Sequence, residues 1–256
     1  MTVYFIGAGP GAPDLLTLRG AQILARCTVC LYAGSLVPQP MLDRCPPGAR
    51  LVDTARMPLP DIVGEMVRAH ESGLDVARLH SGDISLYSAF TEQARRLDAA
   101  GVPYEIVPGV PAFAAASASL GRELTVPGVG QSLLITRVST LSTDMPAGED
   151  LASLARTGVT LALHLAAHRA AALTDDLLPH YGADCPVAVV AFASRDDEVI
   201  VRCRLADLPA RLAEAGITKT AVIFVGKVLD SALDDDAVEE SYLYSARRLR
   251  APGASH

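Results

Sequence analysis

The sequence of 256 residues lacks the features that mark a membrane protein or a general nucleic-acid binder. No stretch of about 18 apolar residues runs without a charged interruption, so no transmembrane span is predicted. Positive charge is not in excess, because the formal net charge is −7 at pH 7, and this argues against binding to nucleic acid or to a membrane surface. Residues 1–10 contain no basic leader, so we expect no signal peptide and a cytoplasmic protein.

A second cysteine pair is also missing. Cys27 and Cys30 have the C-x-x-C spacing, but no further pair follows to complete a zinc site. The total of five cysteines is odd, which favours free thiols in a reducing compartment. We therefore interpret these cysteines as structural thiols and expect no metal site.

Strand-like and helix-like segments alternate along the chain, which predicts an α/β fold of two domains with mostly parallel sheets. The predicted strands are 3–6, 28–32, 76–79, 104–107, 132–136, 160–165, 187–191, 199–204 and 221–225. The predicted helices are 17–26, 62–72, 88–100, 112–120, 169–181 and 208–215. Because Pro127, Gly128 and Gly130 cluster, we predict an N-terminal domain over 1–121 and a C-terminal domain over 122–256. The C-terminal domain ends in a charged tail after Asp230, whose residues 251–256 we expect to be disordered.

Three glycine- or proline-rich turns follow predicted strands of the first half. The first is Gly7-Ala8-Gly9-Pro10-Gly11, where glycine would let the backbone approach a ligand closely. Its glycine spacing differs from the dinucleotide fingerprint, and a simple tight turn explains it equally well. The second turn is residues 80–87 and the third is residues 107–112. Because ligands of α/β sheets bind at the carboxyl ends of strands, the three turns together predict one ligand crevice.

Asp83 is the candidate polar ligand-binding residue of the second turn. Its carboxylate could accept hydrogen bonds from ribose hydroxyls, or it could orient the backbone of its own turn. An N-cap of the helix that follows explains the residue equally well. The sequence leaves these interpretations open.

The order and spacing of these motifs resemble the tetrapyrrole (corrin/porphyrin) methylases over about residues 1–230. The resemblance rests on the first turn together with Asp14-Leu15-Leu16-Thr17-Leu18, on residues 81–87 and on residues 107–110. Within that family, residues 31–37 and 131–137 resemble the precorrin-4 C11-methyltransferases. Relatives that act on uroporphyrinogen carry an acidic residue where Ala33 stands and a basic one near Asp53 and Thr54. Their acid and base assignments therefore do not carry over, and the catalytic residues stay unknown.

The resemblance implies two α/β domains, a cleft between them that holds S-adenosylmethionine, a tetrapyrrole substrate and a homodimer. Some positions match the family's cofactor contacts, and the match is looser for the last four of them. They are Pro10, Ser81, Gly82, Asp83, Leu86, Pro111, Ala112, Leu165, Ala193, Thr220 and Ala221.

Other candidates carry less weight. His164 and His168 are four residues apart, but a predicted strand end separates them, which argues against a zinc pair. Four cations could contact the carboxylates of a substrate, because the planar guanidinium of arginine suits carboxylates. For each of them we favour the interpretation as a solvated surface charge. These cations are Arg122, Arg137, Arg169 and Lys219. Tyr32 and Tyr87 are interpreted as core aromatic residues.

The sequence therefore predicts a methyltransferase that acts on C11 of precorrin-4 or of its cobalt-bearing counterpart. Because the sulfonium methyl is already activated, positioning is the enzyme's main task and a general base is optional. A methylase of the same fold for another precorrin carbon, a protein or ribosomal RNA is the first alternative. A nicotinamide-dependent oxidoreductase and a non-catalytic tetrapyrrole or nucleotide carrier are alternatives from other classes.

Overall fold

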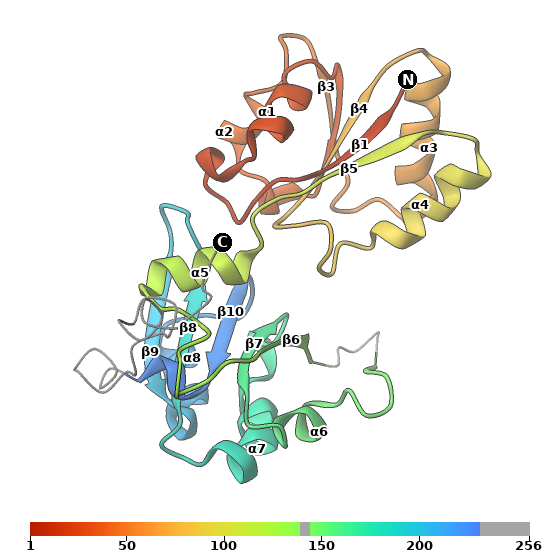
Figure 1. Cartoon of the computed structure of the whole chain (residues 1–256). Coiled ribbons are helices and arrows are strands. Elements are labelled where there is room, and N and C mark those ends of the chain that lie inside the picture. Colours follow the sequence, from red (N-terminus) through yellow and green to blue (C-terminus); the bar gives the residue numbers. More distant parts are fainter. Residues whose placement is uncertain (139–143, 231–256) are drawn as a thin grey trace, which may run out of the picture. The chain divides into compact units, whose positions relative to one another are not determined.

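The computed structural model describes residues 1–138 and 144–230 of the chain, which Figure 1 shows as a coloured ribbon. These residues form two compact units. The N-terminal unit comprises Met1–Ala115 and a returning segment, Phe192–Asp197, and the C-terminal unit comprises Ala116–Ala191 and the chain from Glu198 onward. The predicted boundary at 121/122 lies near the observed change of unit inside helix α5. The sequence contains no signal for the return of residues 192–197.

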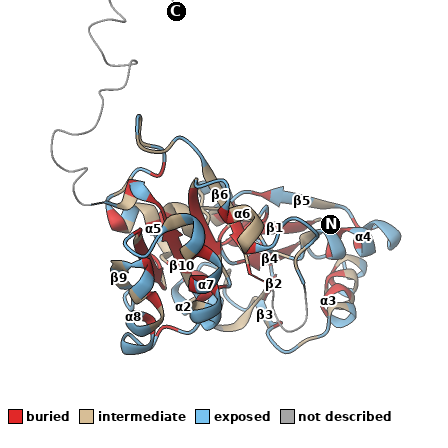
Figure 2. Cartoon of the chain, turned by 90° about the horizontal axis from the view of Figure 1, so that it is seen from below, coloured by how far each residue is buried: buried red, intermediate tan, exposed pale blue. Residues whose placement is uncertain are grey.

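The N-terminal unit contains a five-stranded sheet in the order β3-β2-β4-β1-β5, and all its pairings are parallel. Its strands are β1 (Val3–Gly7), β2 (Val29–Tyr32), β3 (Arg50–Asp53), β4 (Val76–His80) and β5 (Tyr104–Val107). The strands β1 and β4 are wholly buried (Figure 2). Since both faces of a parallel sheet are covered, β1 reads in the sequence as a continuous apolar run, whereas β4 also buries Arg78 and His80.

Helices cover both faces of this sheet. They are α1 (Leu18–Leu24), α2 (Gln39–Leu42), α3 (Leu59–Glu71) and α4 (Phe90–Ala99). Leu24 of α1 and Met41 of α2 belong to the apolar core on one face, whereas Met66 of α3 and Leu97 of α4 belong to the core on the other.

The C-terminal unit contains a second five-stranded sheet in the order β6-β7-β10-β8-β9. Its strands are β6 (Leu133–Arg137), β7 (Thr160–His164), β8 (Pro186–Ala191), β9 (Val199–Arg204) and β10 (Ala221–Val225). Only β6 and β7 pair in parallel, and the other three pairings are antiparallel. The predicted α/β fold with mostly parallel pairing is confirmed for the two sheets taken together, and the antiparallel pairs are confined to the second sheet. The short connection from β8 to β9 accounts for the antiparallel pairing of these two strands, because a parallel crossover needs about a dozen residues or more.

The remaining helices are α5 (Ala112–Leu120), α6 (Leu151–Ala155), α7 (Ala170–Tyr181) and α8 (Leu208–Glu214). Short 3-10 helices occur at Pro13–Leu15, Gly34–Leu36, Ala167–Arg169, Leu205–Asp207 and Lys227–Leu229. Strand β3 was not predicted, because it is a mostly exposed edge strand without an apolar run. Residues 139–143 and the charged tail after Asp230 lie outside the described residues.

The described residues contain no helix that is both long and apolar enough to cross a membrane. All five cysteines are free thiols. Cys27 and Cys30 are fully buried in the apolar core beside α1, and burial raises the pKa of Cys27 to about 12. These observations support their interpretation as structural thiols.

Candidate active site

The three predicted turns lie side by side at one edge of the N-terminal sheet. Parallel pairing places the ends of β1, β4 and β5 level with one another, since Gly7 is opposite His80 and Ile6 is opposite Val107. The first two turns then bond directly. The Gly9 N–H donates to the Gly82 carbonyl at 3.1 Å and the Gly82 N–H donates to the Gly9 carbonyl at 2.7 Å. The turns that the sequence singled out therefore contact one another, and the ligand crevice that they predict stays a prediction.

Glycine is required where the turns touch. A Cβ atom on Gly109 would overlap the carbonyl oxygen of Gly82 and lie 2.7 Å from the Cα atom of Gly7. Gly82 has a φ of +70°, which is a left-handed conformation that side chains with a Cβ atom disfavour. The turns therefore meet through their backbones.

Asp83 holds two of the turns together. One carboxylate oxygen accepts a hydrogen bond from the Gly109 N–H at 2.7 Å, and the other accepts from the Ser85 N–H at 2.9 Å and from the Ser85 hydroxyl. Burial raises the pKa of Asp83, but these hydrogen bonds outweigh it and lower the pKa below its usual value. Helix α4 begins only at Phe90, so the N-cap interpretation is wrong and the turn-orienting one is supported.

The other predicted cofactor residues of the first half lie on the same turns. Pro10 and Leu86 are half-buried, and Ser81 is exposed. Pro111 and Ala112 are half-buried at the start of α5, where the Pro111 carbonyl accepts the Ala114 N–H at 3.1 Å. Backbone donors and acceptors of such turns suit the polar groups of a nucleoside-like ligand.

The returning segment 192–197 packs against the first turn. The Ser194 hydroxyl accepts the Ala12 N–H at 3.0 Å, and Gly11 has no room for a Cβ atom because the side chain of Arg195 occupies that space. Arg195 in turn lies 5.1 Å from the centre of the Phe192 ring and forms an ion pair with Asp197 at 2.9 Å. Sequence reasoning singled out Ala193 here but missed Ser194 and Arg195, because 182 residues separate Ser194 from Ala12.

A cavity of about 580 Å³ opens in the N-terminal unit beside this contact. Three stretches of the chain line it: Gly11–Asp14, Pro38 with Pro40, and Ser194–Asp197. Prolines fix the backbone of its walls, and Asp14, Arg195, Asp196 and Asp197 supply charged groups. The cavity adjoins the predicted glycine-rich turn through Gly11.

The predicted residues of the C-terminal unit lie at one edge of the second sheet. Leu165 follows β7 and Thr220 precedes β10, and the antiparallel register of these strands brings the two positions to the same edge. Both residues adopt left-handed conformations, with φ of 54° and 52°. Ala221 is opposite Ala191, so β8 ends at this same edge. Phe192, the next residue, also has a left-handed conformation, with a φ of 52°. Such strained residues cluster at functional sites.

His80 is a buried neutral imidazole rather than a titrating catalyst. Its side chain is 7% exposed, and burial together with the nearby Arg78 lowers its pKa to about 3. Tyr32 packs against the core as predicted. Tyr87 does not, because it is 46% exposed in a left-handed turn conformation.

The weaker candidates do not form a metal site or one cation cluster. His164 ends β7 and His168 lies in a 3-10 helix, and the described part of the chain contains no group of metal-ligating side chains. Arg137 ends β6 level with His164, at the edge that carries Leu165. Lys219 is exposed beside Thr220.

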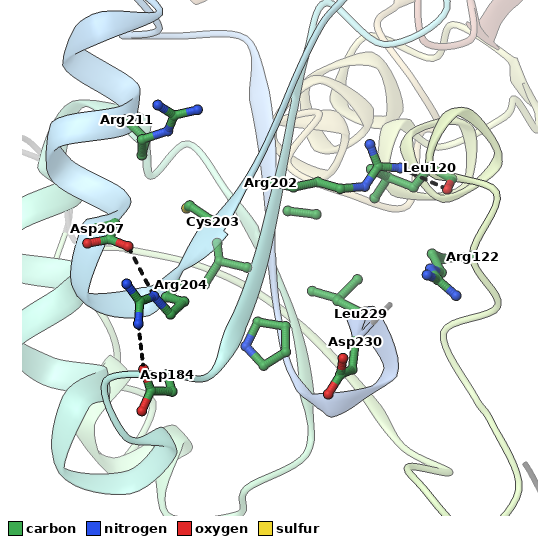
Figure 3. Close-up of a pocket in the computed structure, with 13 residues that line it drawn as sticks. Leu120, Arg122, Asp184, Arg202, Cys203, Arg204, Asp207, Arg211, Leu229 and Asp230 are labelled. Atoms are coloured by element: carbon green, nitrogen blue, oxygen red, sulfur yellow. Dashed lines mark hydrogen bonds and ion pairs between the residues drawn. The ribbon is translucent and has the colours of Figure 1, made fainter. Parts of the chain in front are cut away.

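Arg122 lines a second cavity of about 580 Å³ within the C-terminal unit (Figure 3). Arg202, Arg204 and Arg211 also line this cavity. Its charges are already engaged by the protein, since Arg204 pairs with Asp184 at 3.1 Å and with Asp207 at 3.3 Å. None of the predicted cofactor residues lines it, so we do not assign it to the active site.

Comparisons with known proteins agree with the motifs. The sequence profile of the tetrapyrrole (corrin/porphyrin) methylases matches residues 2–209. The chain is 60% identical over 250 residues to a precorrin-4 C(11)-methyltransferase of Rhodococcus erythropolis. The alignment covers 98% of this chain and 99% of that protein. It is 40% identical over 254 residues to a cobalt-precorrin-4 C(11)-methyltransferase of Methanocaldococcus jannaschii, with 96% and 98% covered.

Solved structures share the fold. The X-ray structure of a cobalamin biosynthetic enzyme, cobalt precorrin-4 methyltransferase, superimposes with a TM-score of 0.87 at 39% identity, covering 90% of this chain and 96% of that one. A uroporphyrin-III C-methyl transferase from Thermus thermophilus complexed with S-adenyl homocysteine gives a TM-score of 0.75 at 27% identity, covering 90% and 93%. Sequence motifs, fold and relatives agree that this chain belongs to the tetrapyrrole (corrin/porphyrin) methylases.

Proposed function

We propose that this protein transfers a methyl group from S-adenosylmethionine to C11 of precorrin-4, or of its cobalt-bearing counterpart, in cobalamin biosynthesis. Relatives named for this reaction match almost the whole chain at 60% and 59% identity. The structural observation that carries the proposal is the contact of the turns at Gly9, Gly82 and Gly109, which forms a backbone-lined surface at the carboxyl edge of the sheet.

The turns fit S-adenosylmethionine by their chemistry. The ligand carries ribose hydroxyls and an amino-acid group, which backbone N–H and C=O groups can recognise without side chains. A Cβ atom on Gly82 would have only ordinary contacts, 3.8 Å from the Cα atom of Pro111 and 3.7 Å from the backbone nitrogen of Ala112. We assign cofactor binding to Pro10, Ser81, Gly82, Asp83, Leu86, Pro111, Ala112, Leu165, Ala193, Thr220 and Ala221.

The mechanism that follows is one of positioning. When bound, the cofactor supplies an activated methyl group on a sulfonium. The chain's task is to hold a nucleophilic carbon of the tetrapyrrole in line with that methyl group, which lowers the entropic part of the barrier. Asp83 is an unsuitable general base, because both of its oxygens accept hydrogen bonds from the protein. His80 is unsuitable as well, because it is buried.

Two measurements test the proposal. Calorimetry should detect binding of S-adenosylhomocysteine and none of NAD. Mass spectrometry should then show the gain of one methyl group by precorrin-4, and parallel reactions with the cobalt-bearing substrate show which form is preferred. A protein that binds NAD, or that leaves both tetrapyrroles unmethylated while other precorrins react, would contradict the proposal.

Gly82→Val tests the cofactor assignment. A β-branched side chain at a φ of +70° is strained and fills the space where backbone and ligand would meet. We expect a folded variant with at least about tenfold weaker binding of S-adenosylhomocysteine, which corresponds to about 1.4 kcal/mol. Circular dichroism checks folding, and calorimetry checks binding. Wild-type affinity in the folded variant would remove Gly82 from the site.

We also infer a homodimer in the cytoplasm. Five free thiols support a reducing compartment, and the family resemblance supports the dimer. Light scattering coupled to gel filtration tests the oligomeric state, because a monomeric mass at micromolar concentration would contradict it.

A further inference from the structure

Strand β4 carries a buried cation without a carboxylate partner among the described residues. The Arg78 side chain is 5% exposed, and its hydrogen-bond partners are neutral. A buried charge is costly unless it is well bonded. The position therefore calls for an explanation beyond ordinary packing, and the partners of Arg78 supply one.

One arm of the guanidinium reaches the turn after β2. Nη1 of Arg78 donates to the Thr54 hydroxyl at 2.9 Å, and that hydroxyl donates to the Tyr32 carbonyl at 2.9 Å. The neighbouring Asp53 accepts the Gly34 N–H at 2.9 Å. Tyr32 and Gly34 begin the segment that leads to Pro38 and Pro40, one wall of the cavity in the N-terminal unit.

The other arm reaches the turn after β4. Nε of Arg78 donates to the Gln93 side-chain oxygen at 3.1 Å, and the Gln93 amide nitrogen donates to the Ala89 carbonyl at 3.1 Å. Gln93 is only 2% exposed. Tyr87 and Ala89 have φ of 52° and 53°, which are strained conformations that persist only where their surroundings hold them.

The bonds form a continuous chain through the core from the Tyr32 carbonyl to the Ala89 carbonyl. Each link of this chain joins one donor to one acceptor, and its three side chains, Thr54, Arg78 and Gln93, are each at least nine-tenths buried. Arginine suits the central position because its planar fork presents Nε and Nη1 at a fixed angle to two acceptors, which a lysine ammonium on a flexible stem does not.

We propose that Arg78 is a positioning residue that sets the Tyr32–Gly34 turn and the Ile84–Ala89 turn in one mutual geometry. It touches neither cofactor nor substrate. The inference rests on the proposed function, because that function assigns Ser81, Gly82, Asp83 and Leu86 to the cofactor, and the inference itself takes the cavity beyond the 32–34 turn as the space for the tetrapyrrole. Thr54 then positions the 32–34 turn on the substrate side, and Gln93 positions the 84–89 turn on the cofactor side.

Single-arm variants test this division. Gln93→Met removes the bonds to the 84–89 turn and should weaken S-adenosylhomocysteine binding about tenfold, with KM for precorrin-4 within about twofold of wild type. Thr54→Val keeps the shape, removes the hydroxyl, and should raise KM for precorrin-4 by about tenfold with nearly unchanged S-adenosylhomocysteine affinity. Arg78→Met should both weaken S-adenosylhomocysteine binding and raise KM for precorrin-4. Arg78→Lys should keep at most one of these two constants at its wild-type value.

Thr174→Val is the matched control. Thr174 is a buried threonine of the C-terminal unit whose hydroxyl has no hydrogen-bond partner, so its replacement should leave both ligand constants unchanged. If Arg78→Met does not fold, the two single-arm variants still decide the matter.

The proposal is overturned if both single-arm variants lose only thermal stability, or if both change the two ligand constants equally. These failures differ from a failure of the proposed function, since that would appear in the wild-type protein as no binding of S-adenosylhomocysteine or no methylation of precorrin-4.

Discussion

The two sheets of this protein gather functional residues in different ways. In the N-terminal sheet every pairing is parallel, so all strand carboxyl ends lie at one edge and the loops after β1, β4 and β5 meet there. In the C-terminal sheet three pairings are antiparallel. Its candidate edge therefore combines the ends of β7 and β8 with the start of β10.

The difference explains why the motifs are clear in the first half and diffuse in the second. Parallel strands repeat one pattern, an apolar run followed by a glycine turn, and each repeat adds to the same site. The second edge depends on left-handed residues that are not glycine, such as Leu165 and Thr220. Single residues of this kind leave no motif in the sequence.

The largest expected effect tests how tightly the N-terminal turns are packed. Gly109→Ala places a Cβ atom against the backbone of Gly7 and Gly82, and rigid backbone cannot move aside cheaply. We expect a loss of about 3 kcal/mol or more in the free energy of unfolding, measured by denaturant titration.

Gly130→Ala is the matched control in the C-terminal unit. Its Cβ atom would lie 3.1 Å from a methyl carbon of the Val228 side chain, which can shift. A much smaller loss is expected there. Equal losses of unfolding free energy in the two variants would show that the contact between the turns is packed no more tightly than the surroundings of Gly130.

The next effect concerns two aspartates with similar local bonding. Asp83→Ala removes hydrogen bonds to Ser85 and Gly109 and should cost roughly 2–3 kcal/mol of stability. Because the turn then loosens, S-adenosylhomocysteine binding should weaken by roughly ten- to a hundredfold. Thermal melting and isothermal titration measure the two losses separately.

Asp150 of the C-terminal unit provides the comparison. It accepts the Ser153 N–H at 2.9 Å and the Ser153 hydroxyl at 2.8 Å as the N-cap of α6. Asp150→Ala should lower stability and leave cofactor affinity alone. A loss of affinity without a loss of stability in Asp83→Ala would instead indicate that Asp83 contacts the cofactor directly.

Acid should destabilise both units through one buried histidine each. Burial lowers the pKa of His80 to about 3, with a contribution from Arg78, and burial lowers that of His164 to about 4. Each folded pKa lies below the unfolded value of about 6.5, so the unfolded state binds the proton first. The stabilisation is complete above pH 6.5 and is lost as the pH falls toward 3 or 4.

Between pH 7 and pH 5 each histidine should account for about 2 kcal/mol of the loss. His80→Gln and His164→Gln should each flatten the dependence of unfolding free energy on pH by about that amount. An unchanged slope in either variant would show that the histidine of that unit is accessible to protons in the folded state.

The smallest expected effect is the loss of a helix cap at the edge of the site. The Thr17 hydroxyl accepts the Gly20 N–H at 3.2 Å at the start of α1. Thr17→Ala should cost about 1 kcal/mol and change S-adenosylhomocysteine affinity less than twofold. A larger loss of affinity would place the start of α1 in the cofactor site and widen the contrast between the two units.

Much of the fold was predictable from local patterns, and the failures have identifiable causes. The buried parallel strand Val3–Gly7 is apolar along its whole length, so it was found. Strand β3 was missed, because an exposed edge strand needs no apolar run. The antiparallel pairing of the second sheet was missed, because strand direction depends on connection geometry rather than on strand composition.

The sequence by itself determined the glycine turns, because glycine is the residue that tolerates close backbone contact and a positive φ, and so it marks such places in any context. It also determined the family through the order of those turns. Only the tertiary structure decided that Asp83 orients its turn, that Ser194 binds Ala12, and that Arg78 links two turns through the core. Polar side chains bond to whatever the fold brings within about 3 Å, and partners far apart in sequence leave no local signal.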